Sequence, residues 1–168
     1  DSHALLISFH PASAINKVSI ETKNFKARSL TVNDLVEDYN AVMSSVGHLN
    51  AVFDPNDTWP TADLTLEQDL IDLGWHQKEF QNRSSFTYTV MNPDESTCLG
   101  CVYIYPSQKA HYDASVFLWI RQSHSALLDD QLLLDVKTWI NAHWWFTSVA
   151  YPGRQPTWEQ WELLPPSQ

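Results

Sequence analysis

The stretch over residues 113–129 reads Asp113-Ala-Ser-Val-Phe-Leu-Trp-Ile-Arg-Gln-Ser-His-Ser-Ala-Leu-Leu-Asp129. Its first part, from Ala114 to Ile120, is largely apolar and predicts a buried strand. A short polar loop follows, and apolar residues then recur at helical spacing from Leu127 to Ala142. Such a junction directs free backbone N–H groups and the positive end of a helix dipole at one spot, which favours an anion such as a pyrophosphate.

The segments on either side of this junction predict further strands. Residues 85–90 alternate polar and apolar side chains, and a second strand follows over 98–105. The turn over 92–95 joins these two strands into an antiparallel hairpin. A short strand is predicted over 25–30, and a final one over 146–151, after the long helix.

Two helices are predicted between the first strands and the hairpin. Thr31 with Asp34, and Thr65 with Gln68, have the spacing of capping boxes. The apolar period extends the first of these helices to about Leu49. The whole order indicates the α+β class, with a mixed, mostly antiparallel central sheet flanked by helices.

The composition fits one folded domain over 1–168, with a lead-in over 1–24 and a short tail over 152–168. Hydrophobic residues make up 43% of the chain and eight residues are Trp, which is the opposite of a disordered composition. The 20 acidic residues against 10 basic ones give a formal net charge of −10. This sign disfavours nucleic-acid binding and suits a basic or amine-bearing partner.

The chain is expected to be cytoplasmic. No stretch approaches the ~18 consecutive apolar residues of a membrane span. The apolar run over 4–9 is too short for a signal peptide, and it lacks a basic stretch before it. We therefore expect no membrane partner.

The sequence contains no motif for metal, redox or hydrolytic chemistry. Cys98 and Cys101 lie in a predicted strand, where residues three apart point to opposite faces, so they are expected to be ordinary strand cysteines. His76 and Glu79 are helix neighbours without the second histidine of a metalloprotease, and a surface or packing role is expected for them. Neither a Gly-x-Ser-x-Gly elbow nor a Gly-rich phosphate loop is present.

From about Phe25 to Tyr151 the chain resembles the GNAT superfamily of acetyl-CoA-dependent N-acetyltransferases. The stretch Ala27-Arg-Ser-Leu-Thr-Val-Asn-Asp34 is similar to that family's first strand and first helix, and the hairpin over 85–105 to its central strands. Ile120-Arg-Gln-Ser-His-Ser-Ala126 lies where the family keeps an Arg/Gln-x-x-Gly-x-Gly/Ala loop. Here His124 stands in the place of the first glycine.

The resemblance implies an acyl-CoA N-acyltransferase-like fold that takes acetyl-CoA as co-substrate and needs no metal. Backbone N–H groups of 122–127 would hold the pyrophosphate. The pantetheine arm would pair like an extra strand between the 114–120 and 146–150 strands, which splay apart in this fold. The implied cofactor-binding residues are Leu118, Trp119, Ile120, Arg121, Gln122, Ser123, His124, Ser125, Ala126 and Leu127.

Two residues are candidates for acid–base catalysis. Acetylation of an amine needs a deprotonated nitrogen and a proton for the leaving thiolate. Asp113, at the mouth of the 114–120 strand, is the candidate base, and Tyr151, just past the last strand, is the candidate acid. The alternatives are a turn residue for Asp113 and a packed rim aromatic for Tyr151.

The segment over 29–77 contains nine acidic residues and neither Lys nor Arg. In the resembled fold this segment walls the acceptor side, where it would attract a cationic amine. Trp59 and Trp75 would add cation–π contacts if both line the same cleft. The alternative is a solvated helix face in an acidic protein.

The family usually continues after its fifth strand with a helix and two more strands, whereas only 17 residues follow Tyr151 here. The C-terminal part of the fold is therefore expected to be shortened. The strand-like stretches over 4–9 and 17–22, or a partner chain in a homodimer, are the candidates for covering the vacated sheet edge.

Three functions remain open from the sequence. The first is an N-acetyltransferase that moves an acetyl group from acetyl-CoA to a primary amine of a small or peptidic, cationic acceptor. The second is a degenerate GNAT-like module that binds acyl-CoA or a protein without catalysis, which His124 favours. The third is an acidic binding module with an interface of tryptophans, namely Trp144, Trp145, Trp158 and Trp161.

Overall fold

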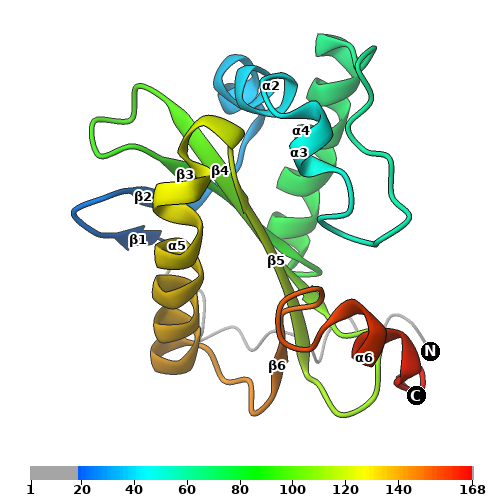
Figure 1. The fold of residues 1–168 in the computed structure, drawn as a ribbon. Helices are drawn as coiled ribbons and strands as arrows, with labels where there is room; N and C mark the ends of the chain where they lie inside the picture. The colour runs from blue at the N-terminus through cyan, green and yellow to red at the C-terminus, as the bar shows by residue number, and fades with distance from the viewer. Residues whose placement is uncertain (1–18, 168) are drawn as a thin grey trace.

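One six-stranded sheet organises residues 19–167, the part of the chain that the computed structural model describes (Figure 1). Its strands lie side by side in chain order: β1 (Ser19–Glu21), β2 (Lys26–Ser29), β3 (Phe86–Met91), β4 (Cys98–Pro106), β5 (Ala114–Ile120) and β6 (Val149–Ala150). All neighbours are antiparallel except β5 and β6, which are parallel. The predicted α+β class and the β3–β4 hairpin are confirmed.

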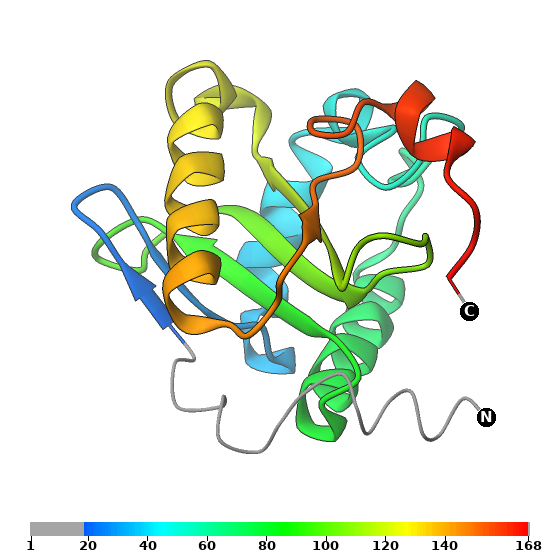
Figure 2. The same ribbon diagram turned by 90° about the horizontal axis from the view of Figure 1, so that it is seen from below.

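Helices lie on both faces of this sheet. The long helix α5 (Gln122–His143) crosses one face, whereas α2 (Leu35–Met43) and α4 (Leu66–Asn82) lie on the other (Figure 1 and Figure 2). The shorter helical elements are η2 (Val32–Asp34), α3 (Val46–Leu49) and α6 (Trp158–Leu163). No helix in residues 19–167 is both long enough and apolar enough to cross a bilayer.

The helix starts at Thr31 and Thr65 are confirmed, since both residues form complete capping boxes, with Asp34 and Gln68. The prediction of one helix from Thr31 to Leu49 is wrong. The chain begins there as the short turn η2, and α2 ends at Met43 before α3 begins. The Ser44 hydroxyl donates to the carbonyl of Ala41 at 2.8 Å, so a side chain competes with the backbone where the helix breaks.

Helix α5 begins five residues earlier than predicted. The segment expected to be a loop, 121–126, contains the helix start: Arg121 is the N-cap, and the His124 N–H already bonds the Arg121 carbonyl at 3.0 Å. Strand β6 is shorter than the predicted 146–151. The chain segment that leads into β6 is held by Asp113, whose carboxylate accepts the N–H groups of Thr147 and Ser148.

The stretch over 17–22 does not cover the C-terminal sheet edge. Within it, β1 pairs with β2 at the opposite edge, far from β6. The stretch over 4–9 lies outside the described residues. Beside β6 the tail folds back instead, with a bridge between Lys109 and Pro166 and a ring contact of 6.0 Å between Tyr112 and Trp161.

A β-bulge corrects the prediction for the two cysteines. Met91 pairs with Cys98, but its neighbour Val90 pairs with Gly100, so β4 carries one extra residue at this point. The extra residue shifts the alternation by one, and Cys98 and Cys101 therefore face the same side of the sheet. Both are free and buried in the cluster under α2.

We predict that Gly100→Ala strongly destabilises the fold. A Cβ at Gly100 would overlap the backbone carbonyl of Trp119 in β5, and neither backbone can move without breaking the β4–β5 ladder. The expected loss exceeds the 1–3 kcal/mol typical of an overpacked core, and it is measured as the free energy of unfolding in urea.

Gly47→Ala in α3 is the matched control, because nothing lies within 4 Å of its added methyl group. This change should be neutral or stabilise the protein by about 0.5–1 kcal/mol, as alanine replaces glycine in a helix. Equal unfolding free energies for the two variants would contradict the close approach of β4 and β5.

Candidate functional site

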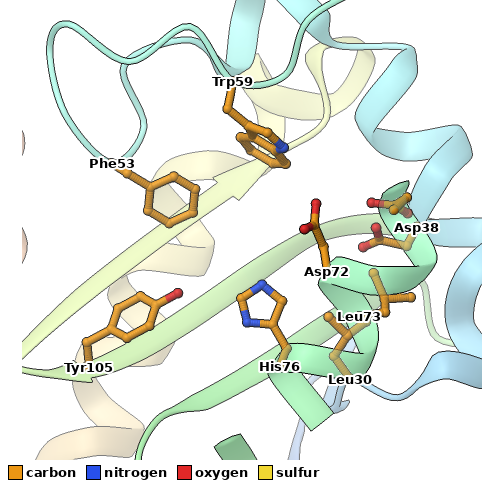
Figure 3. A pocket seen from close by; sticks show the side chains of 9 residues that line it. Leu30, Asp38, Phe53, Trp59, Asp72, Leu73, His76 and Tyr105 are labelled. Atoms are coloured by element: carbon orange, nitrogen blue, oxygen red, sulfur yellow. The ribbon is translucent and has the colours of Figure 1, made fainter. Parts of the chain in front are cut away.

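A pocket of about 200 Å³ opens on the sheet face covered by α2 and α4 (Figure 3). Its walls come from five places in the chain: the residue after β2, helix α2, helix α4, the loop over 50–64, and strand β4. The lining residues are Leu30, Asp38, Phe53, Trp59, Asp69, Asp72, Leu73, His76 and Tyr105. Apolar and acidic side chains therefore share one small space.

The aromatic part of the pocket is tied to strand β5. The Phe53 ring lies 4.8 Å from the ring of Tyr103 and 5.7 Å from that of Trp59. It also lies 5.3 Å from the ring of Phe117, which projects from β5. The loop over 50–64 thus brings its aromatic rings down onto the middle of the sheet.

The acidic part is a buried pair of carboxyl groups from two helices. Asp38 of α2 is only 4% exposed and Asp69 of α4 only 2%. Burial and the neighbouring Asp69 charge raise the pKa of Asp38 well above its ordinary range, and burial raises the pKa of Asp69 as well. The hydrogen bond between the two groups favours the protonated form of Asp38 and the ionised form of Asp69.

One oxygen of this pair has no partner. Asp69 Oδ2 is buried without a hydrogen bond in the described part of the chain. Asp38 is better satisfied, because the Cys101 thiol donates to its Oδ1 at 3.6 Å. A buried acceptor without a donor costs about 1–3 kcal/mol.

His76 lies one helical turn beyond Asp72 on α4, and both side chains point into the pocket (Figure 3). The Nδ1 atom of His76 lies 3.1 Å from the Thr87 hydroxyl, and its ring packs 5.6 Å from that of Tyr103. Burial lowers the pKa of His76 below its ordinary value. At neutral pH the imidazole is therefore uncharged and can accept a proton.

Strands β5 and β6 separate almost as soon as they meet. They pair only at Ala114 with Val149 and at Ser115 with Ala150. From Val116 to Ile120 no described strand pairs with β5 on this side, so the two strands form a fork. The splay that the resemblance implied is confirmed.

Two polar groups lie at and beyond the point where the strands part. The Ser115 hydroxyl, on a residue only 3% exposed, has no hydrogen-bond partner in the described structure. Farther along, Arg154 donates to the carbonyl of Leu118 at 3.3 Å and forms a two-pronged pair with Asp129, at 2.7 and 3.0 Å. Arg154 thus occupies a backbone acceptor on the open edge of β5.

The start of α5 is held from the α2–α3 side. The Ser45 hydroxyl accepts the N–H of Gln122 at 3.0 Å, and His48 Nε2 lies 3.0 Å from the carbonyl of Ile120. The Arg121 guanidinium also turns this way, toward the Cys98 carbonyl, Asn40 and Ser44. Gln122, Ser123 and His124 remain exposed.

The structure does not bring Asp113 and Tyr151 to the pocket. The Asp113 carboxylate accepts two backbone N–H groups, at 2.7 and 3.1 Å, at the start of β5. Tyr151 is 6% exposed and packs in the core on the α5 side, with the Lys137 ammonium 5.2 Å from its ring. It directly follows Ala150, however, and so lies where the fork opens.

The acidic segment over 29–77 contributes only part of its charge to the pocket. Asp38, Asp69 and Asp72 line it, with Trp59. Trp75 does not, because it is exposed on α4 beside Lys78. Two of the sequence's candidate interface tryptophans also have inner contacts: Trp144 packs against the core, and Trp161 against Tyr112.

Sequence reasoning missed the roles of Asp38, Asp69 and His76. A signal was present, since Asp38 lies four residues before Val42, and Asp69 four before Leu73. An acidic residue on the apolar stripe of a helix is buried when that stripe packs on a sheet. His76 continues the same side of α4 as Leu73 and Asp72.

No family model and no curated protein matches this sequence. Solved structures do match. One is a GNAT-family acetyltransferase from Bordetella pertussis, with a TM-score of 0.53, 12% identity, and coverage of 74% of this chain and 70% of that one. Another is the ribosomal-protein-S5-alanine acetyltransferase from Vibrio fischeri, with a TM-score of 0.56, 17% identity, and coverage of 74% and 68%.

A third match is RimL, a ribosomal L7/L12 α-N-protein acetyltransferase in complex with coenzyme A. Its TM-score is 0.59 at 14% identity, with coverage of 73% of this chain and 67% of that one. This chain has the GNAT fold. The β5–β6 fork and the helix that follows β5 are thus parts of this fold, and the pocket lies on the face of the sheet opposite α5.

We predict that Asp38→Asn stabilises the folded protein at neutral pH. A raised pKa in the folded state means that the Asp38 contribution is fully present below its unfolded pKa and is lost as the pH rises through the folded pKa. Between the two pKa values the free energy of unfolding falls by about 1.4 kcal/mol for each pH unit. An asparagine removes this loss, and it can still accept from Cys101 and donate to Asp69.

Urea unfolding of both proteins from pH 4 to pH 8 measures the effect. The variant's advantage should be smallest at pH 4 and should grow as the pH rises. An advantage that stayed constant across this range would show that Asp38 is ionised in the folded protein.

Proposed function

We propose that this protein is an N-acetyltransferase, which moves the acetyl group of acetyl-CoA to a primary amine of a small or peptidic, cationic acceptor. The observation that carries this proposal is the pocket of acidic and aromatic side chains beside the forked strand β5 of a GNAT fold. Solved structures with this fold include acetyltransferases of ribosomal proteins, which is consistent with an amine acceptor.

The residues of the fork fit the acetyl donor. The open edge of β5 offers backbone groups for the pantetheine arm, and the buried Ser115 hydroxyl lacks a partner where β5 and β6 part. The exposed first turn of α5, around Ser123 and His124, offers the positive end of a 22-residue helix to a pyrophosphate. The proposed cofactor segment thus remains 118–127, as a strand end and a helix start rather than a loop.

The acceptor side is supplied by the pocket. Its carboxylates attract a cation, and Trp59 presents an aromatic ring to it. His76, uncharged and held through Thr87, is the group we assign to take the proton from the attacking nitrogen. It replaces Asp113, whose carboxylate is already used by the backbone at the β6 side.

The thioester supplies the acyl group: its carbonyl carbon bonds the amine nitrogen as the carbon–sulfur bond breaks. The thiolate that leaves needs a proton, and we assign this step to Tyr151. Its hydroxyl stays protonated at neutral pH, because burial raises its pKa further above the ordinary value. Tyr151 also follows β6 directly at the opening of the fork.

A thermal-shift titration tests donor binding. Acetyl-CoA and CoA should each raise the melting temperature in proportion to ln(1 + [ligand]/Kd), and buffer should not. Arg154→Met should enlarge the shift, because it frees the Leu118 carbonyl for the pantetheine arm. Arg28→Met is the matched control, since Arg28 makes a similar two-pronged pair with Asp34 away from the fork.

A smaller shift for Arg154→Met than for Arg28→Met would mean that Arg154 contacts the donor instead of blocking it. Absence of any shift with CoA or acetyl-CoA would overturn the proposed function. Donor binding without turnover on any amine would favour the non-catalytic acyl-CoA-binding alternative.

We predict that Tyr151→Phe lowers kcat by roughly 10²-fold or more, the range for loss of a general acid. The ring stays, so packing and the Kd for acetyl-CoA should hardly change. Turnover is followed as release of the free CoA thiol. Ser115→Ala is the comparison. If Ser115→Ala lowers kcat and Tyr151→Phe does not, the Ser115 hydroxyl and not Tyr151 supplies the proton.

A further inference from the structure

The pocket has two chemically different ends. The pairing of β4 with β5 shows where each end lies along the strands. Cys101, which contacts Asp38, pairs with Trp119. Tyr103 and Tyr105, which lie beside His76, pair with Phe117 and Ser115. Along the strand direction, the His76 end therefore lies nearer the level of Ser115, where β5 and β6 part, and the Asp38–Asp69 end lies farther along, toward Trp119.

The acidic end lacks a donor. Asp69 is 2% exposed and lines the pocket, and its Oδ2 has no hydrogen bond in the described part of the chain. The hydrogen bond between the two carboxyl groups favours a proton on Asp38 and a negative charge on Asp69, which lines the cavity. Asp72 adds a second carboxylate at the exposed mouth. An ammonium group would supply the missing donor and neutralise the buried charge.

This ammonium cannot be the group that is acetylated. A nitrogen attacks a carbonyl carbon only through its lone pair, so the reacting amine must first lose its proton. Carboxylates next to an amine favour its charged form and oppose that loss. The neutral imidazole of His76 is suited to receive the proton, and it lies at the other end of the pocket.

We infer that the Asp38–Asp69 end binds a second, non-reacting cation of the acceptor, so that the preferred substrate is a linear diamine. This inference rests on the proposed function. One ammonium lies against Asp69 Oδ2, the alkyl chain crosses the apolar wall of Phe53 and Leu73, and the other nitrogen lies beside His76.

The length of the substrate is bounded by α4. Asp69 and His76 are seven residues apart on this helix, which corresponds to about 10 Å along its axis. Both side chains converge on the same cavity, so the two nitrogens of the substrate must lie closer together than that. Diamines of intermediate length should be preferred over both diaminoethane and much longer ones.

The test compares three acceptors that differ only at the distal end: diaminobutane, aminobutanol and butylamine. The wild-type protein should acetylate diaminobutane with a kcat/KM at least roughly tenfold higher than the other two, because only the diamine pairs with Asp69. Asp69→Asn should bring diaminobutane down to the level of butylamine and leave the Kd for acetyl-CoA unchanged. Asp72→Asn should do the same to a smaller extent, and it serves if Asp69→Asn does not fold.

Glu67→Gln is the matched control, because Glu67 lies on the first turn of α4, exposed and outside the pocket. It should leave the preference for the diamine intact. Equal kcat/KM for diaminobutane and butylamine in the wild-type protein would overturn the inference, and so would an equal loss for both amines in Asp69→Asn.

Binding without the donor separates this inference from the proposed function. Diaminobutane alone should raise the melting temperature of the wild-type protein and not of Asp69→Asn. If the protein shows this shift but never responds to acetyl-CoA, the inferred cation site stands and the proposed acetyltransferase function is refuted. The reverse result, turnover with a diamine that gives no Asp69-dependent shift, would refute the cation site alone.

Discussion

Strand β5 pairs with many more residues on one side than on the other, and the arrangement of the site depends on this difference in strand pairing. On one side it pairs with β4 over its whole length, from Ala114 to Ile120. On the other side it pairs with β6 at two positions only. A strand held firmly from one side can leave its other edge open without losing its place, so the fork is a stable part of the fold and not a frayed end.

The same ladder fixes the pocket. Gly100 allows the backbones of β4 and β5 to approach closely at Trp119, and the bulge next to it turns Cys98 to the same face as Cys101, under α2. The Cys101 thiol, on the sheet, then donates to the Asp38 carboxylate of α2, and α4 places Asp69 next to Asp38. The contact between Cys101 and Asp38 thus depends on the register that sets which face of β4 Cys101 occupies.

The sequence predicted what local patterns encode. The capping boxes at Thr31 and Thr65, the hairpin and the long helix followed from spacing and periodicity, and the resemblance supplied the fork. The same-face cysteines could not be predicted, because a bulge depends on pairing between strands and not on either strand alone. Likewise, the early start of α5 depends on Ser45, 77 residues away in the chain, which accepts the N–H of Gln122.

The buried carboxylates impose a cost on the folded protein that no contact within residues 19–167 fully offsets, since Asp69 Oδ2 has no donor and Asp38 must keep its proton. Hydrophobic residues of similar size at these two positions would make a more stable core. A ligand that binds only the folded state returns free energy to it. The separation of charge in the pocket then has a chemical reason. In the proposed reaction the acidic end would stabilise a charged nitrogen and the uncharged His76 end would allow a neutral one, which are the two needs of a single substrate with two amines.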